Sequence, residues 1–328
     1  MKKMKKLILL ALILSNTMFL FSACNSASEE AASGNVTADK IIKDLNKGKP
    51  VYLKDAVISG DLDFTLVDNK NIESADAYRV YINQSVTFNN CTFEGKVTGI
   101  KVDDKSIKYF TCFEKNMTFY KCKFKKEVDF TEASARGIVN FSGSSFEEKA
   151  VFEGFSFQFK ENYFSDVFFK NEARFHRISV NGSINFLKTT FEGKTSFQKA
   201  CVLGSFQAGG AGFKLYADFS SMDVLREAIF NTAIFKDKAI FNNVVFRDRA
   251  EFNNAVFNDN AGFKKTDFGG KTEFVETSIS GDLDLKESVF RSGKPITDKI
   301  KIDSADQIKL DGCVFYSSEP VILNDIKK

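Results

Sequence analysis

Phenylalanine recurs in this chain at alternating steps of five and six residues. Between Phe164 and Phe290 the two interleaved series provide 24 positions, of which 18 are Phe, five are Val, Ile or Leu, and one is Ala208. A repeat this strict is typical of architectures in which each short unit buries its apolar residue only by stacking on the next unit. The period therefore restricts the chain to a repeat fold.

Three geometries compete for an eleven-residue period. A right-handed coiled coil has this repeat, but at about 100° per residue the successive Phe side chains would lie about 140° and 240° apart and form no single stripe. A flat strand is excluded because a five-residue step moves the side chain to the opposite face. A coil with corners fits, because each side then contributes one inward Phe and the chain turns between sides.

The residues around each Phe support the cornered coil. The position two before it often holds a small residue, such as Ala239 or Ala250, whose side chain shares the inner face. Asn and Lys, which tolerate tight turns, often follow the Phe. Val180, Val202 and Val224 recur every 22 residues. We therefore predict that one coil has four sides and about 22 residues in total. We predict that the rings of consecutive coils stack in a dry column inside a four-sided tube.

The predicted core contains twenty Phe rings of the regular region. They are Phe119, Phe124, Phe130, Phe141, Phe146, Phe152, Phe164, Phe175, Phe186, Phe197, Phe219, Phe230, Phe235, Phe241, Phe246, Phe252, Phe257, Phe263, Phe268 and Phe274.

The segment AIFNNVVFRDRAEFNNAVFNDNAGFKKTDF, at residues 239–268, resembles pentapeptide-repeat proteins. Their units carry a small residue, a polar residue, a central Leu or Phe and two polar residues. This chain resembles the Phe-centred variety, with an added residue in every second unit, strongly over 113–290 and weakly over 51–112 and 291–323. The resemblance implies an all-β, right-handed quadrilateral β-helix without a common catalytic site. Family members that bind DNA gyrase are cytosolic mimics of acidic DNA, which does not fit the charge and export signal described below.

The N-terminus reads as an export signal, with four lysines followed by an apolar stretch at Leu7–Phe21. This stretch is shorter than the about 20 apolar residues of a bilayer span. Phe21-Ser22-Ala23-Cys24 resembles the lipobox of bacterial lipoproteins, which implies cleavage after Ala23 and acylation of Cys24. Phe21 departs from the usual Leu, Val or Ile. An uncleaved signal anchor and ordinary cleavage near Ala23 are the alternatives.

These patterns divide the chain into six segments. We expect a signal peptide at 1–23, a disordered polar tether at 24–36, an N-terminal helix cap at 37–50 that Thr37 or Asp39 begins, irregular early coils with loop or hairpin insertions at 51–112, the regular β-helix at 113–290, and an irregular C-terminal coil and cap at 291–328.

The charge argues against nucleic acid as a partner. The full chain has 46 basic and 43 acidic side chains, and removal of the signal peptide leaves 42 basic against 43 acidic. Near-neutral, interspersed charge provides no basic surface for nucleic acid.

The cysteines read mainly as core residues. Cys91, Cys122 and Cys313 each stand two residues before a Phe, where Ala stands elsewhere. A disulfide between Cys91 and Cys122, in neighbouring coils, is an alternative in an oxidising compartment. Cys112 and Cys201 fall outside this slot, and we expect them to be more exposed. The absence of a CxxC pair argues against zinc.

The residues that could form a catalytic base, a calcium site or a phosphate loop are better explained as structural residues. His176, the single His, directly follows Phe175, so a solvated corner is favoured over a catalytic base. The pairs at Asp61 and Asp63 and at Asp282 and Asp284 lack the oxygen-rich set that calcium needs. The Gly-rich patch at 209–212 has no following Lys-Ser/Thr of a phosphate loop and reads as a tight corner. We predict no metal and no cofactor.

Two functions from different classes remain. The favoured one is a non-enzymatic, membrane-anchored lipoprotein in the cell envelope, held to lipid through Cys24, whose β-helix is a scaffold that binds an envelope protein or glycan. The alternative is an extracytoplasmic polysaccharide-acting enzyme, which requires acidic residues that converge in one groove.

Overall fold

The computed structural model describes residues 32–316. The predicted signal peptide, the lipidation site Cys24 and the first part of the predicted tether lie outside the described residues, as does the end of the C-terminal segment. The fold is therefore that of the chain from Ala32 to Tyr316.

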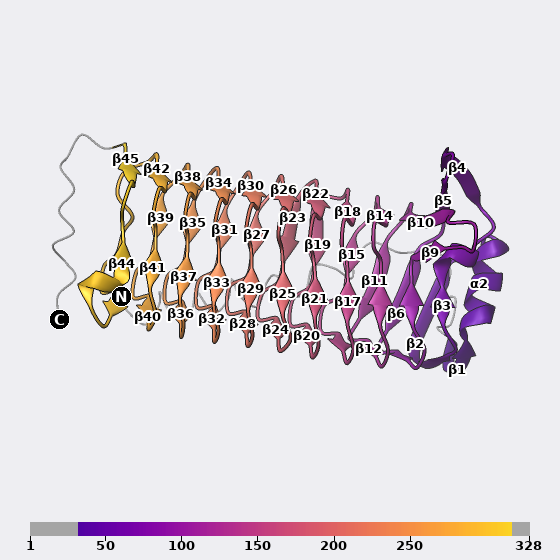
Figure 1. Cartoon of the computed structure of the whole chain (residues 1–328). Helices are drawn as coiled ribbons and strands as arrows, with labels where there is room; N and C mark the ends of the chain where they lie inside the picture. Colours follow the sequence, from indigo (N-terminus) through magenta and orange to yellow (C-terminus); the bar gives the residue numbers. More distant parts are fainter. Residues whose placement is uncertain (1–31, 317–328) are drawn as a thin grey trace, which may run out of the picture. The chain divides into compact units, whose positions relative to one another are not determined.

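These residues form a parallel β-solenoid of about 22 residues per coil, which confirms the predicted fold class. Figure 1 shows the coils stacked side by side along the chain. Each coil has four sides, because a 21-stranded sheet bends around two of them while an 11-stranded and a 13-stranded sheet form the others. We number the sides 1 to 4 in chain order, with the 11-stranded sheet as side 3 and the 13-stranded sheet as side 4.

Most strands have two residues because each side is short. The first strands, β1 (Ala32–Thr37) and β2 (Val51–Ser59), run along sides 1 and 2 together. Side 1 continues with β6 (Val86–Asn89), β11 (Met117–Tyr120), β15 (Val139–Asn140), β19 (Glu161–Tyr163), β23 (Ser183–Asn185), β27 (Phe206–Gln207), β31 (Ala228–Ile229), β35 (Ala250–Glu251) and β39 (Thr272–Glu273). Side 2 continues with β7 (Thr92–Phe93), β12 (Lys123–Phe124), β16 (Ser145–Phe146), β20 (Phe168–Phe169), β24 (Thr190–Phe191), β28 (Gly212–Phe213), β32 (Ile234–Phe235), β36 (Val256–Phe257), β40 (Ser278–Ile279) and β43 (Lys301–Ile302).

The remaining two sides are separate sheets. Side 3 contains β3 (Leu62–Asp63), β8 (Val97–Thr98), β13 (Val128–Asp129), β17 (Ala150–Val151), β21 (Ala173–Arg174), β25 (Thr195–Ser196), β29 (Ala217–Asp218), β33 (Ala239–Ile240), β37 (Ala261–Gly262), β41 (Leu283–Asp284) and β44 (Ile308–Lys309). Side 4 contains β4 (Lys70–Ser74), β5 (Ala77–Ile82), β9 (Ile100–Val102), β10 (Lys108–Phe113), β14 (Ser134–Ala135), β18 (Ser156–Phe157), β22 (Ser179–Val180), β26 (Cys201–Val202), β30 (Asp223–Val224), β34 (Val245–Phe246), β38 (Asp267–Phe268), β42 (Val289–Phe290) and β45 (Val314–Phe315).

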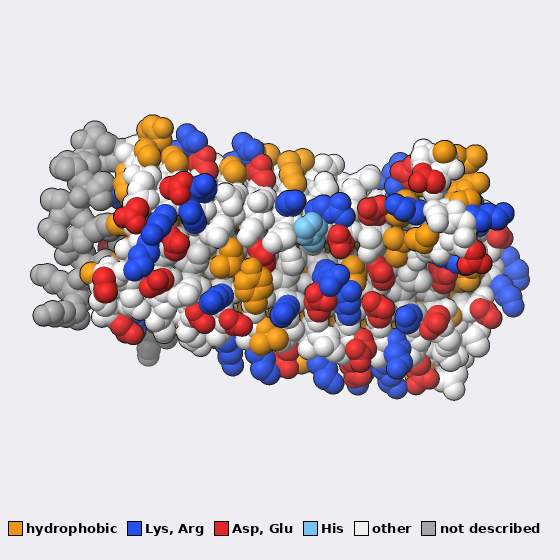
Figure 2. Space-filling model, in the orientation of Figure 1, with side chains coloured by type: hydrophobic (Ala, Val, Ile, Leu, Met, Phe, Trp, Pro, Cys, Tyr) orange, Lys and Arg blue, Asp and Glu red, His pale blue; other side chains and the backbone are white. Residues whose placement is uncertain are grey.

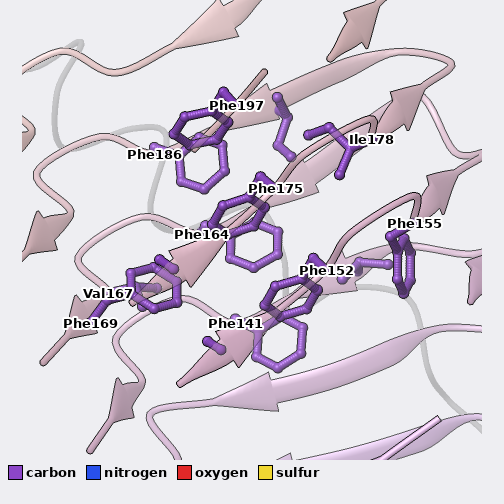
Figure 3. Close-up of a cluster of buried hydrophobic side chains, with 14 of the residues drawn as sticks. Phe141, Phe152, Phe155, Phe164, Val167, Phe169, Phe175, Ile178, Phe186 and Phe197 are labelled. Atoms are coloured by element: carbon purple, nitrogen blue, oxygen red, sulfur yellow. The ribbon is translucent and has the colours of Figure 1, made fainter. Parts of the chain in front are cut away.

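The core is the predicted column of rings. All twenty Phe residues of the predicted core are at most 1% exposed. Rings of one side stack almost parallel from coil to coil, as in Phe219 and Phe241, whose centroids are 4.6 Å apart at 3°. Rings of different sides meet edge to face, as in Phe230 and Phe241 at 5.2 Å and 85°. Figure 3 shows both arrangements among the labelled rings from Phe141 to Phe197. Both geometries suit the quadrupole of an aromatic ring.

The backbone conformation at the corners explains why steps of five and six residues alternate between core positions. After sides 1 and 3, where the next Phe follows in five residues, the second residue beyond the core position has a positive φ, for example Thr232 at +60° and Asn254 at +57°. This left-handed residue makes the corner tighter, so the two core positions on either side of it are connected by five residues instead of six. The five-residue step is therefore a property of these two corners.

The N-terminal helix is α2 (Ala38–Asn46), and Thr37 caps it by accepting a hydrogen bond from the backbone N–H of Lys40 at 3.3 Å. Its buried residues, among them Ile41 and Leu45, belong to the same core cluster as the first coils. Residues 32–36, which the sequence assigned to the disordered tether, belong to β1. Their polar composition concealed the strand, which forms because its backbone pairs with β2 in parallel.

The early coils carry insertions, as the lapses in the repeat indicated. β4 and β5 form an antiparallel hairpin, which projects beside β10 in Figure 1, and β9 pairs antiparallel with β10. A short 3-10 helix, η1 (Phe64–Leu66), precedes the hairpin. Because of the insertions, Ile82 pairs with Phe113, 31 residues later, instead of 22.

The last described coil is longer than the regular ones, and a second 3-10 helix, η2 (Ala305–Gln307), lies within it. Phe315 pairs with Phe290, 25 residues earlier, and their rings stack at 5.0 Å. The ring column therefore continues to the end of the described chain.

Candidate binding groove on side 4

A groove of about 410 Å³ lies where the β4–β5 hairpin meets the first coils of side 4. It is open to solvent along one side. Its lining includes Arg79 and Tyr81 of β5, Cys112 of β10, Ser134 of β14, Arg136, Ser156 of β18 and Gln158, with Glu132 at the adjoining corner.

The floor of the groove is formed by outward residues in one parallel register. Tyr81 pairs with Cys112, Cys112 with Ser134, and Ser134 with Ser156. A large aromatic side chain is thus followed by three small ones, and this change in size makes a step in the surface. Ser179 and Cys201 extend the same row of small residues into the next two coils.

Arg79 is held in place at the hairpin end of the groove. Its guanidinium group donates to the carboxylate of Glu73 at 2.6 Å and to the backbone oxygen of Glu132 at 3.0 Å. It also lies over the ring of Phe110, 5.3 Å from the centroid. These contacts preorganise a planar donor group, and a guanidinium has five N–H donors, so some remain for a ligand.

A second guanidinium lies on the solenoid itself. Arg136 Nη1 donates to Glu114 Oε2 at 2.8 Å, and this hydrogen bond raises the pKa of Arg136. Cys112 Sγ lies 3.5 Å from Glu114 Oε1, and burial raises the pKa of the Cys112 thiol. The thiol therefore stays protonated at neutral pH and is a poor nucleophile.

The carboxyl groups with shifted pKa values in the described chain lie outside the lining of the groove. In each of these carboxyl groups the pKa is lowered from its ordinary value. A catalytic general acid of a glycosidase needs a raised pKa. Within residues 32–316, no cluster of His, Cys, Asp or Glu is placed to hold a metal ion. The groove is suited to binding through hydrogen bonds.

Cys91 and Cys122 lie in the core, in the slot that the sequence indicated. Both are 1% exposed, both are free thiols, and they belong to neighbouring coils because Thr92 pairs with Lys123. Cys313 takes the corresponding position at the C-terminal end, where its Sγ donates to the backbone oxygen of Leu285 at 2.7 Å.

The two remaining cysteines differ from each other. Cys201 is exposed, as expected. The expectation of a more exposed Cys112 is wrong, because this residue is only 3% exposed. Its side chain points outward but lies between Tyr81 and Ser134, beneath the groove.

The His and Asp residues that the sequence singled out lie at corners and turns of the solenoid. His176 is half-buried at a corner after side 3. Asp63 accepts a hydrogen bond from the backbone N–H of Thr65 at 2.9 Å, and Asp284 accepts one from that of Lys286 at 3.1 Å. These bonds satisfy backbone donors at the turns.

The remaining candidates belong to the ordinary surface. Asp61 accepts from the backbone N–H of Lys96 at 2.8 Å, while Asp282 lies in the loop before β41. In the glycine-rich patch, Gly210 takes the left-handed corner conformation with φ +66°. On the face shown in Figure 2, basic and acidic side chains are interspersed. No helix among the described residues has the length and hydropathy that a bilayer crossing requires.

The sequence pattern does not predict the groove. Residues 78–82 alternate like a strand, and this pattern indicated the hairpin, but nothing in the spacing relates Arg79 to Glu132, 53 residues later. Only the register of β5 on β10 brings these residues together.

A family model of pentapeptide repeats matches residues 241–289 in nine copies. No curated protein and no solved structure matches the chain. The matched segment lies inside the regular part of the solenoid, where the five- and six-residue steps alternate without interruption. Because the coil geometry of the matched residues 241–289 extends over the whole regular solenoid, the two observations together support a pentapeptide-repeat protein.

Proposed function

We propose that this protein is an exported lipoprotein whose solenoid is a non-enzymatic binding scaffold at the cell envelope. The observation that carries the proposal is the position of the lipobox-like Phe21-Ser22-Ala23-Cys24, which ends eight residues before Ala32, the start of β1. Eight residues span at most about 29 Å. An acylated Cys24 therefore holds the first coil close to the membrane surface.

The body of the protein suits a scaffold. Parallel pairing joins each coil to the next on all four sides, and one core cluster extends from Val36 to Ile300. In a solenoid of this kind each coil contacts only its neighbours, so its sides are extended surfaces. The groove lies in the early coils, at the end of the solenoid to which the tether is attached, and is the surface that we assign to partner binding.

The partners that we propose are membrane lipid, through Cys24, and an envelope protein or glycan. Nucleic acid is not proposed, because the charge is near neutral. The polysaccharide-acting enzyme remains a hypothesis from sequence, because the lining residues of the groove include one carboxylate, Glu132, whereas a glycosidase uses a pair.

Metabolic labelling with palmitate tests the anchor. In a bacterial host that processes lipoproteins, the wild-type chain should incorporate the label and fractionate with membranes, whereas Cys24→Ser should incorporate none. Cys201→Ser is the matched control, because Cys201 is an exposed cysteine of the solenoid, and it should be labelled like wild type. Equal labelling of Cys24→Ser and wild type, or an unlabelled wild type, would refute the proposal.

A further inference from the structure

We propose that the groove on side 4 binds a neutral, hydroxyl-rich oligosaccharide. This inference deepens the proposed binding function and rests on it for its biological setting. Three properties of this surface suit such a ligand: paired guanidinium groups, unengaged polar groups in the lining, and a row of small outward residues that continues along the solenoid.

Both guanidinium groups of the groove are paired with carboxylates before any ligand arrives, and one further carboxylate leaves a net negative charge. Arg79 is paired with Glu73 and Arg136 with Glu114, and Glu132 adds a further carboxylate to the lining. An anionic ligand would meet these carboxylates as well as the guanidinium groups. A neutral ligand meets planar N–H donors beside carboxylate acceptors, which together suit neighbouring hydroxyl groups that both donate and accept.

The lining of the groove includes polar side chains that make no hydrogen bond with another described residue. The Ser156 hydroxyl and the side-chain amide of Gln158 both line the groove, and neither makes a hydrogen bond with another described residue. Each can donate and accept. The Tyr81 ring at the hairpin end supplies an apolar surface with a polar tip, which suits the C–H face of a sugar ring and its hydroxyl rim.

The row of small outward residues continues along side 4 beyond the groove. Beyond Ser156, the next outward residues are Ser179 and Cys201, which are small and exposed. The row ends at Asp223, which forms an ion pair with Arg247. An extended ligand can therefore lie across several coils, and so we infer an oligosaccharide rather than a single sugar.

The test uses the full chain, purified in detergent, and calorimetric titration with cellotetraose, maltotetraose and the β-1,4-linked tetramer of N-acetylglucosamine. Tetragalacturonate is the anionic comparison. At least one neutral tetramer should bind, at least tenfold more tightly than tetragalacturonate. Binding of none of the neutral tetramers, or tighter binding of tetragalacturonate, would overturn the proposal.

Two variants then locate the site. Ser156→Val fills the floor, and Gln158→Ala removes the free amide; each should weaken binding at least tenfold. The coil accepts Val at this position, because Val245 and Val289 occupy it in later coils. Val245→Ser, four coils from Ser156 on the same side, is the matched control and should change affinity less than twofold. Equal affinities of Ser156→Val, Gln158→Ala and wild type would place binding elsewhere and overturn the assignment.

The outcome is independent of the anchor. Cys24→Ser should bind the same tetramer as wild type with an affinity within twofold. Sugar binding without palmitate labelling would refute only the lipoprotein proposal, and labelling without sugar binding would refute only this inference.

Discussion

The hydroxyl group of Thr277 donates a hydrogen bond of 2.7 Å to the backbone oxygen of Phe252 inside the solenoid. The same oxygen accepts from the backbone N–H of Ala255 at 3.0 Å. Thr266 makes the corresponding bond to Phe241 at 2.6 Å. The small-residue slot of the repeat therefore links neighbouring coils when it holds a hydroxyl, whereas Ala in this slot only fills space.

Replacement of Thr277 by Val should lower the free energy of unfolding by about 1 kcal/mol, because it removes a buried hydrogen bond while the volume is nearly unchanged. Denaturant unfolding followed by circular dichroism measures this loss. Thr190→Val is the control, since Thr190 points outward and its hydroxyl makes no hydrogen bond with another described residue. A loss for Thr190→Val as large as that for Thr277→Val would contradict the role of the internal bond.

The stacked Phe rings of the core should contribute much of the free energy of unfolding. Phe241 stacks between Phe219, at 4.6 Å, and Phe263, at 4.8 Å, and is fully buried. Phe241→Ala should cost about 3–5 kcal/mol, because it removes buried apolar surface and leaves a cavity. Phe168 points outward from β20 and is 38% exposed. Phe168→Ala should therefore change stability by no more than about 0.5 kcal/mol, and similar losses for both variants would refute the stacked column as the main core.

The sequence predicts the regular coils because their information is local and repeated. One inward Phe per side, a small residue two positions earlier and a polar corner define the tube wherever the pattern holds. The left-handed corner residue is not visible in this pattern, because the second position after the core residue holds types as different as Thr232, Asn254 and Glu276.

The groove could not be predicted because it arises where the repeat lapses. Its position depends on how the β4–β5 hairpin packs on side 4, and Arg79 contacts the backbone of Glu132, which is remote in sequence. The burial of Cys112 has the same origin, since Tyr81 pairs beside it. Similarly, β1 was missed because its pairing with β2 is a backbone property that its polar residues do not reveal.

The corner at Thr232 should be improved by a single substitution. Thr232 has φ +60°, which is costly for a β-branched residue, whereas Asn254 has φ +57° at the same corner of the next coil. Thr232→Asn should raise the free energy of unfolding by about 0.5–1 kcal/mol, because Asn tolerates this conformation. The reverse variant, Asn254→Thr, should lower it by a similar amount. Thermal unfolding of both variants checks the opposite signs, and changes of the same sign would rule out corner strain as the cause.

Oxidation should link Cys91 to Cys122. The two thiols lie in neighbouring coils, and a hydrogen bond from Cys122 lowers the pKa of Cys91, whereas burial raises the pKa of Cys122. Cys91 therefore ionises first and is the attacking thiolate.

Treatment of the reduced protein with hydrogen peroxide should form this disulfide, which peptide mass spectrometry detects as a cross-link that dithiothreitol removes. Its rate should rise with pH and reach half its maximum below the ordinary thiol pKa of about 8.5. Cys201 is the reference, because it is exposed and burial of part of its surface raises its pKa, so alkylation of this residue should reach half its maximum above that pH. The cross-link closes a loop of about 31 residues and should stabilise the early coils by up to roughly 4 kcal/mol. Separate oxidation of Cys91 and Cys122 without a cross-link would show that their side chains cannot meet in the core.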